Sequence, residues 1–219
     1  MQQASQDKVI SIIGGDYFYP ISILLETLFS FEEPNDVQET SVQTNHIQNG
    51  YSSAICLLLV AALESFLARF AYIKTSTQGE TQKDFRENFK EKHPEFIYKK
   101  ELDEIYVLRD CLIHNHLLTL DYNRLTMEKL KAEKDKRSGD KKYDQCVDSV
   151  THKTKILELN VNPIRVDRHD VKKVIKIVKE TLLFLEDKYK PQIQISDLML
   201  RLSDSQDKKL LDILDHYSS

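Results

Sequence analysis

Glycine and proline are scarce in this chain, with five of each among 219 residues. Each therefore makes up about 2% of the sequence, against roughly 7% and 5% in an average protein. Tight hairpin turns, dinucleotide-binding loops and phosphate-binding loops depend on these residues. The scarcity therefore disfavours an all-β fold, a Rossmann nucleotide-binding fold and a P-loop enzyme.

Cysteine is also rare. The three cysteines, Cys56, Cys111 and Cys146, lie far apart, and no CxxC pair or Cys/His cluster accompanies them. A disulfide framework and a structural zinc site are therefore not expected, and we predict neither a metal nor a cofactor. Such cysteine usage fits a reducing cytoplasmic compartment best.

Long hydrophobic runs are missing as well. The longest, Ala54 to Leu63, has ten residues, about half of what a bilayer span requires. The first 16 residues lack a basic segment followed by a sustained apolar one, so we expect neither a signal peptide nor a membrane partner.

Charge of one sign does not dominate, since the formal net charge is −4. A protein that binds nucleic acid over its whole surface is usually basic, so such binding must be local here. The stretch 129–142 has seven Lys/Arg against three Asp/Glu, a local excess of +4. Two interpretations stay open: an ordinary solvated helix or loop, and an electrostatic collar for a polyanion.

The sequence is rich in helical patterns. Charged residues (30%) and hydrophobic residues (41%) are balanced as in a soluble helical protein. Apolar spacing predicts helices at 17–31, 50–74, 81–92, 99–118 and 170–188, and one or two more within 195–217. Residues 155–166 alternate apolar and polar, which suggests a short strand pair or an extended crossing segment.

These patterns predict an all-α fold, a helical bundle with a short extended or β-like segment before the last core helix. We expect one domain over 1–190, with a motif region at 50–118 and a charged excursion at 123–150. Residues 191–219 would then form a C-terminal helical appendage.

Glu64 interrupts the most apolar helix, which is apolar on all sides from Ala54 to Leu63. A buried carboxylate is costly unless it is paired. Glu64 therefore either lies half-exposed at the end of the buried part or has a cationic partner.

Polar groups crowd one end of the predicted helix 99–118, in the segment Leu108-Arg109-Asp110-Cys111-Leu112-Ile113-His114-Asn115-His116. Arg109 and His114 are five residues apart, which places them roughly 140° apart around an α-helix. Two geometries would bring them together. The helix changes pitch near His114, or a second copy of the chain supplies the complementary pair across a two-fold axis.

An arginine and a histidine in one cleft suit RNA cleavage. RNA carries its own nucleophile, the 2′-OH, and a histidine that titrates near neutrality can take or return the proton. An arginine can hold the scissile phosphate and offset the charge that develops on it. Asp110 and Asn115 could orient this pair or bind phosphate and ribose. DNA lacks the 2′-OH, so this chemistry is confined to RNA.

The segment RDCLIH, residues 109–114, resembles the R-x4-6-H motif of HEPN domains (higher eukaryotes and prokaryotes nucleotide-binding). ALESFLARF, residues 62–70, is similar to the LESFL-type helix that precedes this motif in several bacterial members. The resemblance covers roughly residues 50–188. It implies a helical bundle that dimerises through the motif helices. In active members it also implies a metal-independent ribonuclease of toxin–antitoxin, abortive-infection or other defence systems.

Carried over to this chain, the resemblance makes Arg109 and His114 the catalytic residues and Asp110 a supporting polar residue. The family usually has Asn or another polar residue at the position of Asp110. Some toxins carry, two residues after the motif histidine, a tyrosine at which a nucleotidyltransferase antitoxin inactivates them. That position here is His116, which argues against this regulation. His116 is either a second acid–base group or a cation that complements the helix dipole.

Three functions remain open from the sequence. The first is an endoribonuclease whose partners are RNA, a second copy of the chain and, in a toxin–antitoxin system, an antitoxin or other regulatory protein. The second is a non-catalytic HEPN-like module that binds RNA, nucleotide or protein. The third is a plain helical bundle in which Arg109 and Asp110 form an ordinary salt bridge.

Overall fold

The computed structural model describes residues 13–32, 45–75, 85–114, 118–121, 126–129, 138–190, 193–201 and 206–218. The elements, in chain order, are η1 (Ile13–Gly15), α1 (Phe18–Ser30), α2 (His46–Thr75), α3 (Phe85–Lys92), α4 (Lys99–Ile113), β1 (Leu118–Asp121), β2 (Thr126–Lys129), α5 (Ser138–Cys146), α6 (Arg168–Tyr189), β3 (Met199–Arg201), β4 (Asp207–Lys209) and α7 (Leu210–Ser218). The fold is all-α, as predicted. The strands form two small antiparallel pairs, β1–β2 and β3–β4.

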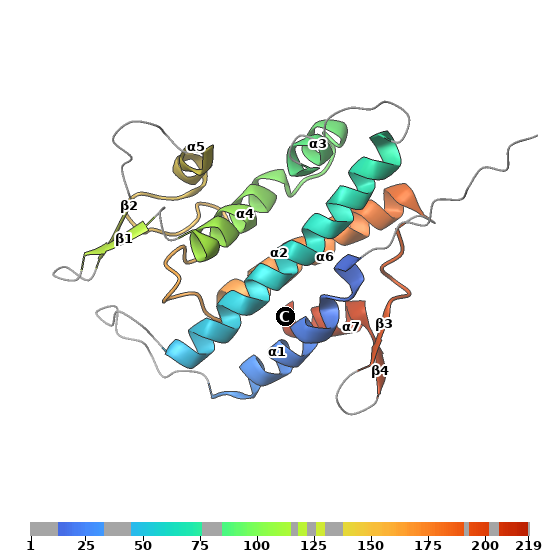
Figure 1. Ribbon diagram of the computed structural model, residues 1–219, viewed down its shortest axis with the longest axis horizontal. Coiled ribbons are helices and arrows are strands. Elements are labelled where there is room, and N and C mark those ends of the chain that lie inside the picture. The colour runs from blue at the N-terminus through green and yellow to red at the C-terminus, as the bar shows by residue number, and fades with distance from the viewer. Residues whose placement is uncertain are drawn as a thin grey trace, which may run out of the picture.

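The two longest helices, α2 and α6, lie side by side through the middle of the molecule (Figure 1). They run in the same direction. Near their starts Asn49 Nδ2 donates to the carbonyl of Val166 at 2.8 Å, and near their ends the rings of Phe70 and Tyr189 lie 4.9 Å apart. In Figure 1, α1 and α7 flank this pair on one side and α3, α4 and α5 on the other. The site residues on α2 and α4 are therefore carried by the central layer and one flank.

A capping box fixes the start of α6. The Asp167 side chain accepts hydrogen bonds from the backbone N–H groups of His169 and Asp170, and the Asp170 carboxylate accepts one from the Asp167 N–H. This reciprocal arrangement satisfies N–H groups that lack partners inside the helix. Burial raises the pKa of Asp170 to about 6. The predicted helix 170–188 is confirmed, with Asp167 as its cap.

The predicted helix 17–31 is also confirmed, and Pro20 lies in its first turn, where a missing N–H costs nothing. Just before it, Gly14 approaches α2 closely and donates its N–H to Ser65 Oγ at 2.9 Å. A Cβ on Gly14 would lie 2.9 Å from the Ala62 carbonyl oxygen. The chain can therefore enter α1 this close to α2 only with glycine at that position.

Helix α2 forms the core, but along one side its apolar residues are only partly buried. By length and composition its stretch His46–Ala71 could cross a membrane, and 56% of its most apolar window is buried in the protein. Core helices of soluble proteins pass the same test, so this is weak evidence for a membrane span. Its partly exposed apolar residues recur at helical spacing: Ala54, Leu57, Leu58, Ala61 and Ala68.

Two expectations about the predicted helices need correction. The helix predicted over 99–118 ends at Ile113, and a strand begins at Leu118. Of the one or two helices predicted within 195–217, the described residues form one, α7, because β3 and β4 pair as a hairpin before it. Short strands of three or four residues hold too few positions to separate a period of two from a period of 3.6, so the sequence pattern missed them.

The strand pair or extended segment predicted at 155–166 is not found: these residues form turns, and Glu158 has a left-handed φ of 52°. Isolated bridges join Val147 to Thr154 and Lys153 to Asn160, without a regular strand pair.

Of the basic stretch 129–142, Lys129 ends β2 and residues 138–142 begin α5, while 130–137 lie outside the described residues. Its two interpretations therefore stay open.

Candidate functional site

Arg109 lies where α4 packs against α2, with 23% of its side chain exposed. Its Nη2 donates to Glu64 Oε1 on α2, and its Nη1 lies 3.0 Å from Asp110 Oδ1. A partly buried guanidinium is thus held by two carboxylates from two helices, as a cation in such a place requires.

Glu64 is both partly exposed and paired with a cation. Its side chain is 40% exposed, and its partner is Arg109. The two interpretations offered by the sequence are therefore both met at once. The apolar helix carries a carboxylate at this point because the neighbouring helix brings an arginine to it.

His114 ends α4 as its C-cap residue. Its N–H donates to the Asp110 carbonyl at 2.8 Å, but its backbone angles, φ −109° and ψ 89°, are no longer helical. The imidazole is exposed. Because the chain leaves α-helical geometry at His114, its side chain is not tied to the helical angle of about 140° from Arg109. The rise along the helix separates the two residues by about 7.5 Å.

The other two residues proposed as supporting, Asn115 and His116, lie outside the described residues. Among the six candidates, the structure brings together Arg109, Glu64 and Asp110 and places His114 at the end of the same helix. The formal charges of the three clustered groups sum to −1, since one guanidinium faces two carboxylates. An anion at Arg109 therefore meets a cation already largely neutralised by its own chain.

Tyr106 is a fourth member of the cluster that the sequence did not single out. Tyr106 is 5% exposed, and the Arg109 guanidinium carbon lies 5.4 Å from its ring centroid. Tyr106 precedes Arg109 by three residues, a spacing that places both on one helical face, so this contact could have been predicted. Arg86 of α3 lies over the same ring at 4.5 Å, a contact between helices that the sequence pattern does not indicate.

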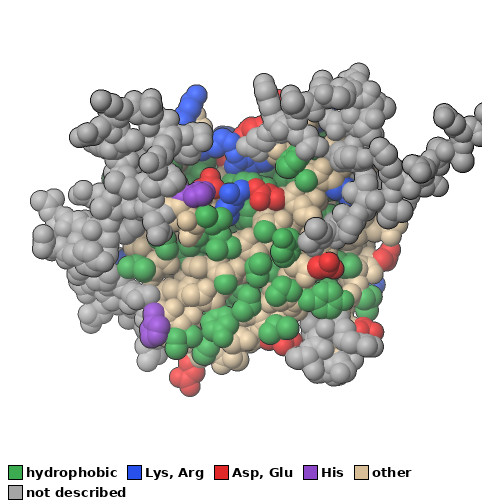
Figure 2. All heavy atoms as spheres, viewed as in Figure 1, with side chains coloured by type: hydrophobic (Ala, Val, Ile, Leu, Met, Phe, Trp, Pro, Cys, Tyr) green, Lys and Arg blue, Asp and Glu red, His purple; other side chains and the backbone are tan. Residues whose placement is uncertain are grey.

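Several large apolar side chains are exposed on α1, α2 and the end of α4. Ile113 of α4 is 51% exposed, and Tyr19 and Ile23 of α1 and Ile47 of α2 are also exposed. Figure 2 shows a histidine, basic and acidic side chains gathered in the upper part of this face, above a broad area of hydrophobic side chains. We call the apolar area formed by α1, α2 and the end of α4 the apolar face. Exposed apolar areas often mark contacts with another protein.

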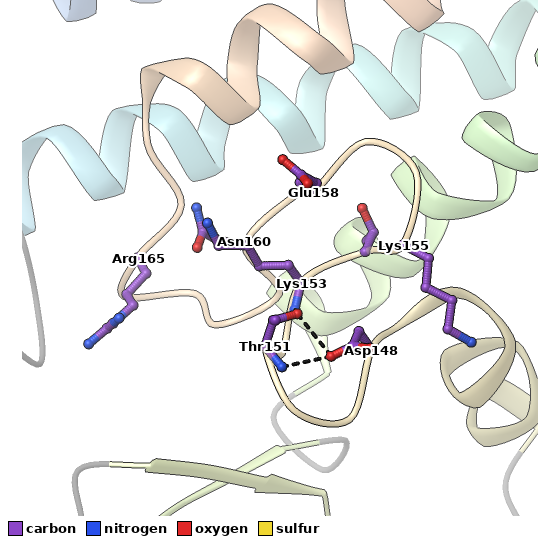
Figure 3. Close-up of a pocket in the computed structure, with 8 residues that line it drawn as sticks. Asp148, Thr151, Lys153, Lys155, Glu158, Asn160 and Arg165 are labelled. Carbon is purple, nitrogen blue, oxygen red and sulfur yellow. Dashed lines mark hydrogen bonds between the residues drawn. The ribbon is translucent and has the colours of Figure 1, made fainter. Parts of the chain in front are cut away.

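A hollow of about 690 Å³ is formed by the segment that joins α5 to α6 (Figure 3). Its lining has three cations, Lys153, Lys155 and Arg165, and two carboxylates, Asp148 and Glu158. Figure 3 shows that Arg165 and Lys155 point away in opposite directions, so the charged groups do not converge.

One of these lining groups, Lys155, also binds elsewhere in the protein. Lys155 Nζ caps the end of α5 by donating to the carbonyls of Asp144 and Gln145, at 3.1 and 2.8 Å. The loop packs on the face of α4 that carries Val107 and Cys111, whereas Arg109 faces α2. The hollow and the Arg109 cluster therefore use different faces of α4.

The part of the chain that the structure describes contains no cluster of side chains suited to a metal site. No group of three or more His, Cys, Asp or Glu side chains is placed to hold an ion there. The buried thiol of Cys111 has its pKa raised to about 12 by burial, with a smaller contribution from the Asp110 charge. Such a thiol stays protonated and is a poor nucleophile.

The arrangement can therefore bind one face of an anion through Arg109 and exchange protons through His114. No protein-family model, no curated protein and no solved structure matches this chain.

Proposed function

We propose that this chain is a metal-independent endoribonuclease of HEPN type, in which Arg109 and His114 act at the interface of a homodimer. The observation that carries the proposal is that helix α4 bears both an arginine held by two carboxylates and, at its end, an exposed histidine. Both lie beside an apolar face that a second copy can cover.

The chemistry assigns a role to each group. The imidazole of His114 takes the proton of the ribose 2′-OH, or returns one to the leaving 5′-oxygen. Arg109 donates hydrogen bonds to the phosphate as negative charge grows on its oxygens. The products expected from attack by the 2′-oxygen are a 2′,3′-cyclic phosphate and a 5′-hydroxyl. Because the RNA supplies its own nucleophile, the 2′-OH, the reaction needs no metal ion.

The charges around Arg109 support a site made by two copies of the chain. In one copy Arg109 is offset by Glu64 and Asp110, and the local sum is −1. A two-fold axis beside α4 would bring a second Arg109 and a second His114 to the same cleft. One histidine can then act as base and the other as acid. The apolar face, with Ile23, Ile113 and the stripe on α2 that includes Leu57, supplies surface for such a contact.

The deciding experiment is an RNA cleavage assay in EDTA. Wild-type protein is incubated with total RNA and with tRNA, beside Arg109→Ala and His114→Ala. His169→Ala, which removes another exposed histidine, is the matched control. We expect cleavage by the wild type and the control, none by the two site variants, and unchanged circular dichroism in all four.

Cleavage of an all-deoxy strand would refute attack by the ribose hydroxyl. Cleavage that survives His114→Ala would remove this histidine from the reaction. Light scattering gives the oligomeric state, and Leu57→Glu, which places a charge in the apolar face, is expected to yield a folded monomer without activity.

A second candidate function follows from the neutralised arginine. If the two carboxylates never release Arg109, the chain is a binding module for RNA, nucleotide or protein that does not cut. That module predicts RNA affinity that is the same in the wild type and in His114→Ala, with no cleavage by either.

A further inference from the structure

The ring of Tyr106 contacts two arginines from different helices. The guanidinium carbon of Arg86 is 4.5 Å from the ring centroid and that of Arg109 is 5.4 Å from it, both within the range of a cation–π contact. Tyr106 is 5% exposed and belongs to the main hydrophobic core. Its position is therefore fixed by packing.

Ion pairs hold Arg86 in place. Arg86 is 4% exposed and lies 3.5 Å from a carboxylate oxygen of both Glu87 and Asp103. Lys90 of α3 contacts Asp103 of α4 at 2.7 Å, and Lys142 of α5 contacts Glu87 at 2.9 Å. These ion pairs join three helices, so the guanidinium of Arg86 is held in place against the ring.

A ring and a carboxylate hold an arginine in different ways. The carboxylates of Glu64 and Asp110 fix the guanidinium but also cancel its charge. The face of an aromatic ring attracts a cation through its quadrupole and leaves the net charge unchanged. A ring contact can thus orient an arginine while keeping it attractive to a phosphate.

We infer that Tyr106 is the positioning residue of Arg109: it sets the plane of the guanidinium so that its free N–H groups meet the scissile phosphate. This inference rests on the proposed nuclease function. Arg86 supports Tyr106 from α3 and does not touch the substrate. Misplacement of a reacting group by about 1 Å can cost about 100-fold in rate, so such positioning matters.

The first measurement uses the wild type and needs no variant to fold. In a proton–nitrogen spectrum the side-chain Nε–Hε signal of Arg109, assigned with Arg109→Lys, is expected upfield of ordinary arginine signals because the ring shields it. Tyr106→Phe keeps the ring and should keep the shift, and Tyr106→Leu should abolish it. An Arg109 signal at the ordinary position in the wild type would overturn the inference.

The second measurement separates positioning from stability. Under single-turnover conditions Tyr106→Leu is expected to lower the cleavage rate by at least about 10-fold, with RNA affinity changed much less. Tyr106→Phe should restore the rate. Tyr143→Leu is the matched control, because Tyr143 is equally buried but packs on the Val107–Cys111 side of α4.

Equal loss of rate in Tyr106→Leu and Tyr143→Leu would show a merely structural role and overturn the inference. Should the wild type leave RNA intact, the proposed nuclease fails. The Arg109 signal still decides then whether Tyr106 positions this guanidinium, so the two failures are distinguishable.

Discussion

Replacing Glu64 with glutamine tests how far the chain's own carboxylates neutralise the candidate phosphate-binding arginine. The amide oxygen of Glu64→Gln can still accept the hydrogen bond from Arg109 Nη2, while the formal charge of the cluster rises from −1 to 0. An anion bound to Arg109 would then lose one repulsive neighbour. We expect Glu64→Gln to bind RNA more tightly than the wild type.

The size of the effect follows from the geometry of one guanidinium. A carboxylate and a phosphate on opposite edges lie about 7 Å apart, because each N–O contact spans about 2.8 Å. Both Glu64 and Arg109 are partly exposed, so an effective dielectric constant of about 40–80 applies, and the repulsion is about 0.6–1.2 kcal/mol. This corresponds to affinity about 3- to 7-fold tighter, since about 1.4 kcal/mol is a factor of ten.

The assay is fluorescence anisotropy of a labelled RNA in the His114→Ala background, where the RNA is expected to stay intact. The ratio of dissociation constants should shrink towards one as salt rises, because the Debye length falls from about 30 Å at 0.01 M to about 3 Å at 1 M. Glu101→Gln, about 12 Å from Arg109 along α4, is the matched control and should change affinity less. Unchanged or weaker binding by Glu64→Gln at low salt would refute the reasoning.

Three further predictions concern the frame that holds the site. Because the pKa of Asp170 is raised, its contribution to stability is full below its ordinary pKa of 3.8 and is lost as pH rises through about 6. Urea titrations should therefore show that the stability advantage of the wild type over Asp170→Asn is larger near pH 4 than at pH 7, by about 2–3 kcal/mol. An advantage that grows with pH would contradict this. Glu104→Ala removes the buried carboxylate that accepts the N–H groups of Ile156 and Leu157, both at 2.8 Å, so chemical denaturation should show a loss of about 2–4 kcal/mol, and a loss below 1 kcal/mol would mean that water replaces it. Gly14→Ala places a Cβ at 2.9 Å from both the Ala62 carbonyl oxygen and the Phe66 ring, so the melting temperature should fall by an amount equivalent to about 1–3 kcal/mol, while Gly15→Ala, which meets no atom within 4 Å, should not lower it comparably.

The long helices were predictable because each carries enough turns for its apolar spacing to be read. The start of α6 was predictable too, since a capping aspartate has a local signature. The end of α4 was not, because Ile113 continues the apolar spacing and no glycine or proline marks the stop. Helix α4 nevertheless ends there, which places His114 at a helix end instead of in mid-helix.

The candidate site shows the same division between local and tertiary information. The proximity of Arg109 to Asp110 and Tyr106 follows from spacing along one helix, whereas the partner of Glu64 depends on how α2 and α4 pack. The sequence narrowed Glu64 to two interpretations but could not name Arg109 as its partner. The contact of Arg86 with Tyr106 has no local sequence pattern that predicts it, because the two residues are 20 positions apart in the chain.

The charges around Arg109 connect these observations to the proposed dimer. A lone copy offers a phosphate one guanidinium, two carboxylates and one exposed imidazole, which is a poor site for an anion. Two copies related by a two-fold axis would offer paired arginines and paired histidines, and the phosphate could bind between the two guanidinium groups, with each pair of carboxylates behind its own arginine. Activity should then depend on the second power of protein concentration below the dimer dissociation constant. A first-order dependence throughout, with a monomer that cuts RNA, would mean that Arg109 and His114 of a single chain suffice and that the apolar face has another purpose.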